Sequence, residues 1–588
     1  SGGCGASPRG RRTFLRPHRK GKIMYTYKGA KYSLEIDGSR AGVILDGCTV
    51  AELDIATGVD TLDENYETAD DADTCLPVLE SVKEDGHTVT FRWTSKSNLW
   101  EEKIYTLVCD PLRFKYSVTV KGKGKVDGVL YFSGCSADGN RLSGYEFQDG
   151  FTPCLSLFNE EDYHFRAMLG CHRWSVLMVP PMFCYAFRTE GLKRQLGIGL
   201  VAEKGEHNFQ SFDFNSHGGI WFSTDQHGHT EVDGEWTAPF IIGFGAEDEY
   251  DVCEKYSKYY YTSGIARPRK KEIPPKFWYG PMACGWIEQF ARADVPGGAL
   301  GRSCERVYRD YLDRLHAGGL YPRCLIIDDK WQSEYAVDAA DPEKWPDLRA
   351  FVDEQHENGV HTMLWFKVFD PEGLSDDACV TADMGGGKLD PPAKKIDPSS
   401  PAFLKVLDDA LYRIFSSDEG CYDCDGIKID YAFMNPIGRK FKTYSGKYGV
   451  ELLYDYMEHI YTVAKKIKPH AIINASACHP YFAHLVDQAR LHDYDGKNRF
   501  CREDLMFRAK MYKIATPDSI IDTDNGGYNT KRDTMRCMLE QSEYGVPDIY
   551  GVSPFPSMTF TDEDFAALSQ VWKEYTDRID AMYEGIEE

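Results

Sequence analysis

The chain has 588 residues, 42% of them hydrophobic, and a formal net charge of −24 at pH 7. A chain of this length exceeds what one hydrophobic core serves, so we expect at least two globular domains. The acidic surplus argues against nucleic acid or an anionic membrane surface as the main partner. No apolar run approaches the length of a membrane-spanning helix, so no membrane partner is expected either.

The first 23 residues and the cysteines indicate in which compartment of the cell the protein is expected. Residues 1–23 are basic and lack an apolar stretch, so they are not a secretory signal; we expect a poorly ordered leader ahead of a natural start at Met24. The 18 cysteines are scattered, and the nearest approach to a metal-binding pattern is Cys421-Tyr422-Asp423-Cys424, which stands alone. This pattern is typical of reduced thiols in a cytoplasmic protein.

Residues 24–245 carry a β pattern. Apolar and polar residues alternate over several short segments, among them 89–93, 104–108 and 114–118. Turn signals separate the segments, including one at 121–124, and the acidic stretch 60–73 is expected to be a solvated loop. The spacing predicts an antiparallel β-sandwich.

Residues 246–275 are expected to join two domains. The stretch 246–263 has the composition of a helix, and 268–275 has proline at both ends with charges between them. From residue 276 the periodicity changes, and apolar runs alternate with amphipathic segments. We expect eight buried strands at 278–286, 324–328, 361–366, 426–430, 471–475, 485–492, 519–522 and 546–552.

Amphipathic helices are predicted between these strands. One begins at Ser400-Pro401, another spans 450–467, a third begins at Pro346-Asp347, and the last spans 561–578. Eight β/α units in 276–588 predict a (β/α)8 barrel, which is a TIM barrel, as the second domain.

Polar groups recur where the predicted barrel strands end. They are Asp328, Asp329, Asp370, Asp430, Asn474, Asp493, Asp495, Asp522 and Asp524. Aspartate is also a common helix cap, so each one has a structural explanation, but their recurrence at one rim points to an active site. Two chemistries use such a set of carboxylates: glycoside hydrolysis and Mg²⁺-assisted catalysis. Lys428, two residues before Asp430, is expected on the same strand face, where its charge suits a carboxylate nucleophile and opposes metal binding.

Several motifs resemble glycoside hydrolases of the clan that contains families 27, 31 and 36, and family 36 α-galactosidases above all. The run 325–331 resembles the second-strand D-D-G-W motif, 361–372 resembles the third unit, and 426–430 resembles the fourth-strand K-W-D. The run 490–493 resembles the sixth-strand segment, and 522–524 resembles the D-x-D motif of family 27. The resemblance covers roughly 277–560, and the β-rich first half matches the N-terminal supersandwich of family 36.

The resemblance implies a role for each matched residue. Asp430 would be the nucleophile and Asp493 the acid/base, with Asp495 as its rival. Sugar-binding roles would fall to Asp328, Asp329, Trp331, Trp365, Lys428, Asn474, Cys478, Arg490 and Asp524. No metal and no cofactor are implied. Departures from the family pattern are Lys330 in place of glycine and 476–481 in place of the fifth-strand glycine-rich signature.

The sequence therefore predicts a retaining exo-α-glycosidase that hydrolyses terminal α-galactosides by double displacement. An α-N-acetylgalactosaminidase or galactosaminidase, or another α-glycosidase of the clan, is the alternative within this class. A catalytically inert carbohydrate-binding protein on the same fold is the alternative from another class. The expected partner is an oligosaccharide or glycoconjugate, and homo-oligomerisation stays open.

Overall fold

The computed structural model divides the chain into two compact units. Unit 1 comprises residues 1–167 and 183–256, and unit 2 comprises residues 168–182 and 257–588. The structure describes the chain except for residues 1–23, 134–144, 148–150, 154–165, 169–178, 190, 216–220, 270–271, 296, 383–391, 492–500, 525–529, 556–557 and 587–588. The expected leader at 1–23 thus lies outside the described residues.

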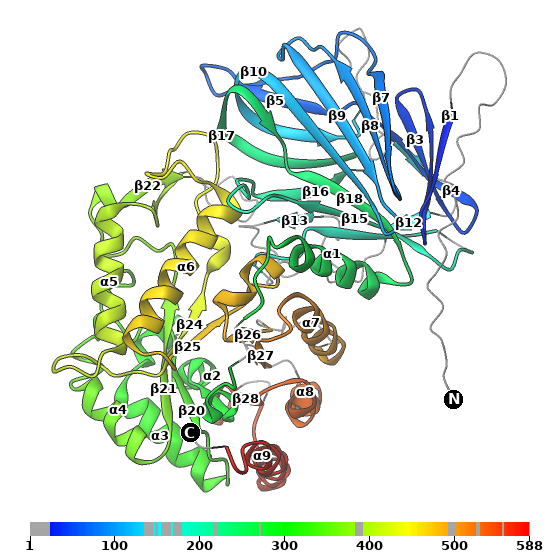
Figure 1. Ribbon diagram of the computed structural model, residues 1–588. Helices are drawn as coiled ribbons and strands as arrows, with labels where there is room; N and C mark the ends of the chain where they lie inside the picture. Colours follow the sequence, from blue (N-terminus) through cyan, green and yellow to red (C-terminus); the bar gives the residue numbers. More distant parts are fainter. Residues whose placement is uncertain are drawn as a thin grey trace, which may run out of the picture. The chain divides into compact units, whose positions relative to one another are not determined.

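Unit 1 contains two antiparallel sheets, as predicted for the N-terminal half (Figure 1). The five-stranded sheet has the order β1 (Met24–Lys28), β2 (Ser33–Asp37), β3 (Arg40–Leu45), β4 (Cys48–Asp54), β11 (Tyr145–Phe147). The main path of the 13-stranded sheet is β12 (Phe151–Pro153), β14 (Cys184–Thr189), β15 (Gln195–Val201), β18 (Phe240–Ala246), β10 (Phe114–Tyr131), β17 (Trp221–Thr237), β16 (Ser211–Asn215), β13 (Arg166–Met168). The remaining strands of this sheet are β5 (Gly58–Leu62), β6 (Thr68–Ala69), β7 (Val78–Asp85), β8 (Thr88–Ser95) and β9 (Glu102–Cys109).

Strands β10 and β17 form the longest pairing of unit 1. Their register runs from Thr119 opposite Thr237 to Tyr131 opposite Phe222. The turn predicted at 121–124 is therefore wrong, because these residues continue β10, with Gly122 opposite Gly234. The partner strand satisfies the backbone hydrogen bonds of this segment, and tertiary pairing overrides its local turn preference.

The two ends of the acidic stretch 60–73 are buried whereas most of 63–70 is exposed, so the prediction of a solvated loop holds for the middle and is wrong for the ends. The carboxylates of Asp71 and Asp73 and the ammonium of Lys103 have no solvent exposure. The Lys103 Nζ lies 2.7 Å from Asp73 Oδ1 and also contacts Asp71. A buried cation between two buried anions offsets their desolvation, which is why these acids tolerate the interior.

Unit 2 contains a parallel barrel, which confirms the predicted (β/α)8 architecture. Its strands, in spatial order, are β27 (Ile520–Asp522), β26 (Gln488–Arg490), β25 (Ile472–Ala475), β24 (Gly426–Asp430), β21 (His361–Lys367), β20 (Cys324–Ile327), β19 (Met282–Cys284) and β28 (Asp548–Ile549). A bridge between Asp522 and Val546 links β27 to the segment that leads into β28 and nearly closes the barrel. Each observed strand lies inside or within one residue of the segment predicted for it.

Helices surround these strands in Figure 1. They are α2 (Trp286–Ala291), α3 (Glu305–Ala317), α4 (Leu348–Glu357), α5 (Pro401–Phe415), α6 (Gly449–Ile467), α7 (Cys501–Ala515), α8 (Lys531–Tyr544) and α9 (Asp562–Met582). Short 3₁₀ helices are η2 (Lys276–Tyr279), η3 (Gly298–Arg302), η4 (Asp376–Ala378), η5 (Ala432–Met434) and η6 (Pro480–Leu485), and β22 (Cys379–Ala382) pairs with β23 (Ala393–Ile396) beside α5.

The helix starts follow from local capping chemistry. The Ser400 hydroxyl accepts a hydrogen bond from the Ala402 N–H at the start of α5, and the Asp347 carboxylate accepts one from Ala350 in α4. Thr561 caps α9 through a capping box. Among the helices of the described residues, none has the length and apolar character that a bilayer crossing requires.

Helix α1 (Glu249–Ser263) occupies most of the stretch predicted as a linking helix. The division between the two units falls within this helix, after Tyr256. The Ser257 hydroxyl donates to the Ile514 carbonyl of α7 and so belongs to unit 2.

Candidate active site

Three of the acids predicted at strand ends share one rim of the barrel. Asp430 is the last residue of β24, Asp328 follows β20, and Asp522 ends β27. Parallel pairing places Lys367 opposite Asp430 and Arg490 opposite Asp522. The carboxyl ends of parallel barrel strands all meet at the same face, where barrel enzymes build their active sites.

Both carboxylate oxygens of Asp430 accept hydrogen bonds. Its Oδ1 lies 3.1 Å from a guanidinium nitrogen of Arg490 and 2.8 Å from the backbone nitrogen of Tyr431. Its Oδ2 lies 3.1 Å from the indole Nε1 of Trp365. The Asp430 side chain keeps 19% of its exposure, so a carboxylate of fixed orientation still reaches the surface of the rim. These donors stabilise the ionised form, which is the form a nucleophile requires.

Arg490 joins Asp430 to a second acid. The fully buried guanidinium lies 2.9 Å from Asp524 Oδ2, and the Tyr550 hydroxyl contacts the other oxygen of Asp524. The cation that neighbours the predicted nucleophile is thus Arg490. The expected partner, Lys428, instead contacts Asp328 at 2.9 Å. Asp430 and Lys428, both on β24, have different partners because strand tilt as well as alternation sets the direction of each side chain across the barrel.

Lys428 lies at the centre of a buried polar cluster. Its Nζ is 3.0 Å from the Tyr550 hydroxyl and 3.5 Å from the Cys284 sulfur, and that thiol donates to Asp328 at 3.0 Å. Burial opposes the charge of Lys428, but Asp328 holds the pKa of the ammonium well above its usual range. Burial and the charge of Asp328 raise the pKa of the Cys284 thiol, which stays protonated. The cluster therefore presents a fixed, ionised Lys428–Asp328 pair.

Asp329 points to a different partner. Its carboxyl accepts a hydrogen bond of 2.9 Å from the Tyr335 hydroxyl. Burial, together with the negative charge of Asp328, raises the pKa of Asp329 to about 7. This acid is consequently close to half-protonated at neutral pH, and it can donate as well as accept a hydrogen bond.

The two tryptophans lie one behind the other. Trp331 is completely buried and donates from its indole to the Trp365 carbonyl at 2.8 Å. Trp365, 1% exposed, packs at 5.9 Å from the rings of both Tyr335 and Tyr431. Trp365 reaches the nucleophile candidate directly, whereas Trp331 supports it from behind.

Asn474 and Cys478, the two candidates from the fifth unit, have different surroundings. The Asn474 amide donates to Asp522 at 2.7 Å, and burial raises the pKa of Asp522 to about 6, with the charge of Asp524 adding to the effect. Cys478 is buried in the loop after β25, where its backbone N–H donates to the Pro180 carbonyl. Asn474 thus belongs to the network of strand-end acids.

The acid/base candidates Asp493 and Asp495 lie outside the described residues. Their roles therefore remain predictions. Sequence reasoning also missed Tyr335, Tyr550 and Cys284, which complete the contacts described above. The last two stand inside predicted strands, at 546–552 and 278–286, so their strand positions were the available signal.

A group that could hold a cation lies at the opposite end of the same strands. His356, His361 and Asp425 bring ligand atoms within 4.8 Å of one another. Lys468 Nζ lies 3.0 Å from Asp425 Oδ1, and hydrogen bonds from the two histidines hold the pKa of Asp425 below its usual range although burial opposes this. Because protein groups already balance this carboxylate, we interpret the cluster as an anchor between α4, β21 and β24.

Comparisons with known proteins identify the fold. No family model matches the sequence, and no curated protein matches it. A GH31 family sulfoquinovosidase from E. rectale aligns with a TM-score of 0.55 at 12% identity, over 95% of this chain and 84% of that chain. A cycloalternan-forming enzyme from Listeria monocytogenes aligns with a TM-score of 0.52 at 12% identity, over 94% of this chain and 57% of that chain. The glucosidase II alpha subunit aligns with a TM-score of 0.52 at 12% identity, over 96% of this chain and 59% of that chain. The chain thus has the β-sandwich-plus-barrel fold of these proteins. It spans less than two thirds of the length of the cycloalternan-forming enzyme and of the glucosidase II alpha subunit.

Proposed function

We propose that this chain is a retaining α-glycosidase in which Asp430 is the nucleophile. The observation that carries the proposal is the geometry of this residue, which ends a central barrel strand and is held by Trp365 and Arg490. Three solved structures with the same fold are described as a sulfoquinovosidase, a cycloalternan-forming enzyme and a glucosidase subunit. Each of these names denotes an enzyme that acts on carbohydrates, which supports a carbohydrate substrate here.

In the proposed mechanism Asp430 attacks the anomeric carbon and forms a covalent glycosyl-enzyme. The leaving glycosidic oxygen receives a proton from Asp493, or from its rival Asp495; in retaining enzymes generally the two carboxyl groups are about 5–5.5 Å apart. The same residue then removes a proton from water, which attacks the anomeric carbon and releases Asp430. Arg490 and the Tyr431 N–H stabilise Asp430 as the returning carboxylate leaving group.

We also propose which sugar is removed: a terminal α-galactoside, as the sequence resemblance to family 36 implies. The ionised Lys428–Asp328 pair and the half-protonated Asp329 supply the donors and acceptors that distinguish sugar hydroxyls. The structural neighbours with other glycones support the alternative, another α-glycosidase of the same clan. α-N-acetylgalactosaminidase or galactosaminidase activity remains part of that alternative, and a cytoplasmic location rests on the cysteine pattern alone.

Release of nitrophenol from nitrophenyl α-glycosides tests the proposal. The panel contains galactose, N-acetylgalactosamine, galactosamine, glucose and sulfoquinovose as glycones, with and without a chelator. We expect hydrolysis of one glycone by the wild type, none by Asp430→Ala, and full activity of Asp376→Ala. Asp376 is a matched control because its side chain is fully exposed on the loop after β21.

Addition of azide to Asp430→Ala then tests the retaining mechanism. A small anion that replaces the missing carboxylate should yield a β-glycosyl azide, because attack occurs on the face opposite the leaving group. Hydrolysis by Asp430→Ala at the wild-type rate would refute the assignment of the nucleophile. Binding of a sugar without any cleavage by the wild type would favour the inert carbohydrate-binding protein, and activity abolished by the chelator would favour Mg²⁺-assisted chemistry.

A further inference from the structure

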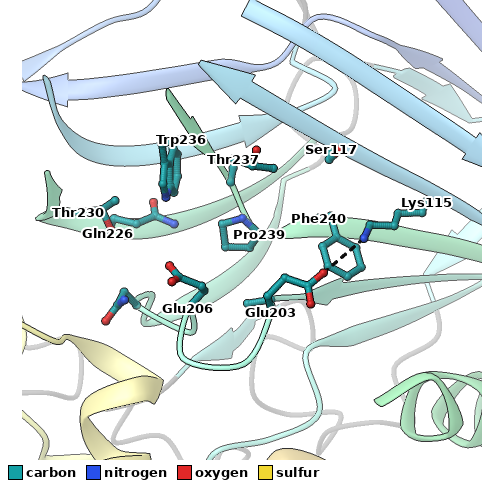
Figure 2. Close-up of a pocket in the computed structure, with 13 residues that line it drawn as sticks. Lys115, Ser117, Glu203, Glu206, Gln226, Thr230, Trp236, Thr237, Pro239 and Phe240 are labelled. Carbon is teal, nitrogen blue, oxygen red and sulfur yellow. Dashed lines mark ion pairs between the residues drawn. The ribbon is translucent and has the colours of Figure 1, made fainter. Parts of the chain in front are cut away.

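A cavity of about 120 Å³ opens in the β-sandwich, entirely within unit 1. Strands β10, β17 and β18 and the loop between β15 and β16 contribute its lining. Figure 2 shows Trp236, Gln226 and Thr230 toward one side, Lys115 and Phe240 toward the other, and Glu206 and Glu203 low in that view. The volume holds roughly ten water-sized groups, which suits one small ring better than a long chain.

Gln226 is the buried polar residue of this lining. The residue is 1% exposed, and one end of its amide pairs with the Thr224 hydroxyl at 2.8 Å. The other end has no hydrogen-bond partner among the described residues. An unsatisfied buried amide costs about 1–3 kcal/mol unless something occupies the adjacent space. Which atom of the amide is unpaired depends on its assigned orientation, but in either orientation one end remains available.

An irregularity in β17 gives Gln226 its position. Asp225 lies opposite Gly128 in β10 and Thr230 lies opposite Val126, so residues 226–229 leave the ladder opposite a single residue. Gly228 in this segment has φ +80°, and a Cβ there would lie 2.5 Å from the Leu62 side chain. Such bulges redirect side chains out of the regular alternation of a strand. The chain thus uses a bulge to direct a buried amide into a cavity.

The other lining residues have the chemistry that recognises a sugar. Trp236 is half-buried and contributes to the lining of the cavity. An aromatic face offers an apolar platform for a pyranose ring, and the lining also carries the hydroxyl of Thr230, a group that hydrogen-bonds sugar hydroxyls.

The charges of the lining residues favour a neutral ligand over an anionic one. Lys115 is the cation of the lining, and its Nζ lies 3.6 Å from the Glu203 carboxylate and 3.5 Å from the centre of the Phe240 ring. Its charge is therefore already paired, and the other charged residues of the lining, Glu203 and Glu206, are both acids. A neutral ligand rich in hydroxyl groups satisfies this combination.

We propose that this cavity is a carbohydrate-binding site that takes one neutral pyranose residue, with Gln226 as its buried hydrogen-bonding group and Trp236 as its aromatic wall. The site belongs to the sandwich and goes beyond the proposed hydrolytic function, on which it does not depend. Binding here would hold a polymeric or glycoconjugate substrate by a residue other than the one cleaved.

Fluorine NMR of the full chain labelled with fluorotryptophan tests the site. Asp430→Asn serves as the background so that no probe is hydrolysed, and Trp236→Phe assigns the signal of Trp236. Methyl α-galactopyranoside, methyl α-glucopyranoside and maltose are the probes. Trp221 provides an internal reference, because it is a half-buried residue of the same strand outside the cavity lining.

We expect the Trp236 signal to shift with half-saturation in the millimolar range for at least one probe, while the Trp221 signal stays fixed. Gln226→Leu, which keeps the size and removes the amide, should weaken this binding at least about fivefold, as loss of one hydrogen bond does. Thr230→Val is the second variant if Gln226→Leu does not fold. No shift of Trp236 with any probe, or an unchanged half-saturation in the folded variants, would overturn the proposal. Because the readout is the Trp236 signal, a negative result here leaves the test of hydrolysis intact.

Discussion

Replacement of Arg490 by methionine isolates the electrostatic role of the buried guanidinium. Methionine keeps an unbranched side chain and removes the charge that lies 3.1 Å from Asp430 and 2.9 Å from Asp524. At an effective dielectric constant of about 20, the attraction between unit charges 2.9 Å apart is about 6 kcal/mol before desolvation is subtracted. Asp430 keeps 19% exposure and can be hydrated, whereas Asp524 has none, so the loss falls mainly on Asp524.

We therefore expect Arg490→Met to destabilise the barrel by about 3–5 kcal/mol, the usual consequence of leaving a buried charge without its partner. The double variant Arg490→Met/Asp524→Asn should be more stable than Arg490→Met alone, because it removes the charge that lost its partner. Activity of the single variant should begin at higher pH than that of the wild type, because Asp430 loses the cation that stabilises its ionised form.

Hydrogen exchange measured by mass spectrometry is the suitable assay, because a chain with two units is not expected to unfold in one step. Peptides that cover 488–491 and 520–524 should lose protection in Arg490→Met by about two to four orders of magnitude. Wild-type protection of both peptides in the single variant, or lower protection in the double variant than in the single one, would refute this electrostatic account.

Three further predictions concern Asp329, Lys103 and Gly228. The folded pKa of Asp329 is about 7 against an ordinary value of 3.8, so the folded state holds a proton that the unfolded state releases, and stability falls as pH rises from 4 to 7. Asp329→Asn removes this pH dependence, so the melting temperature of the variant should rise relative to that of the wild type as the pH increases from 4 to 7. A difference in melting temperature that does not change with pH would contradict the raised pKa of Asp329. Lys103→Met leaves two buried aspartates without their cation and should cost about 3–5 kcal/mol in chemical denaturation of the sandwich, and unchanged stability would contradict this account of the cluster. Gly228→Ala places a side chain at φ +80° and should cost about 1–3 kcal/mol and reduce the sugar response of Trp236, whereas wild-type behaviour would show that the bulge adapts.

Much of the barrel could be predicted from the sequence because buried parallel strands are nearly continuous apolar runs between turn signals. The predicted strand at 426–430 coincides with β24, and the acid at its end lies where expected. Boundaries were less predictable. The segment 278–286 contains only the short strand β19, because residues 276–279 form a 3₁₀ helix and Trp286 begins α2. Aromatic residues favour strands, but here their packing in a helical turn decides.

The contacts inside the site were harder to predict than its members. Sequence alternation placed Lys428 on the same face as Asp430, yet its ammonium meets Asp328 and Tyr550 across the barrel. Partners of this kind come from strands far apart in the sequence, and strand tilt and stagger determine which side chains meet. In the sandwich, Asp71 and Asp73 looked solvated because no local pattern reveals the buried Lys103 that pairs with them.

The pairing that closes the barrel has a consequence for how the chain emerges from the ribosome. Met282 of β19 pairs with Asp548 of β28, so the first strand waits for the last one, whereas the sandwich is fully synthesised by residue 256. During the interval, β19 presents an unpaired edge that other chains could pair with. Val546, the residue after Gly545, bridges to Asp522 of β27, and β28 then covers the free edge of β19. Nascent chains halted before this glycine should consequently hold a complete sandwich beside an open, chaperone-dependent half of the protein.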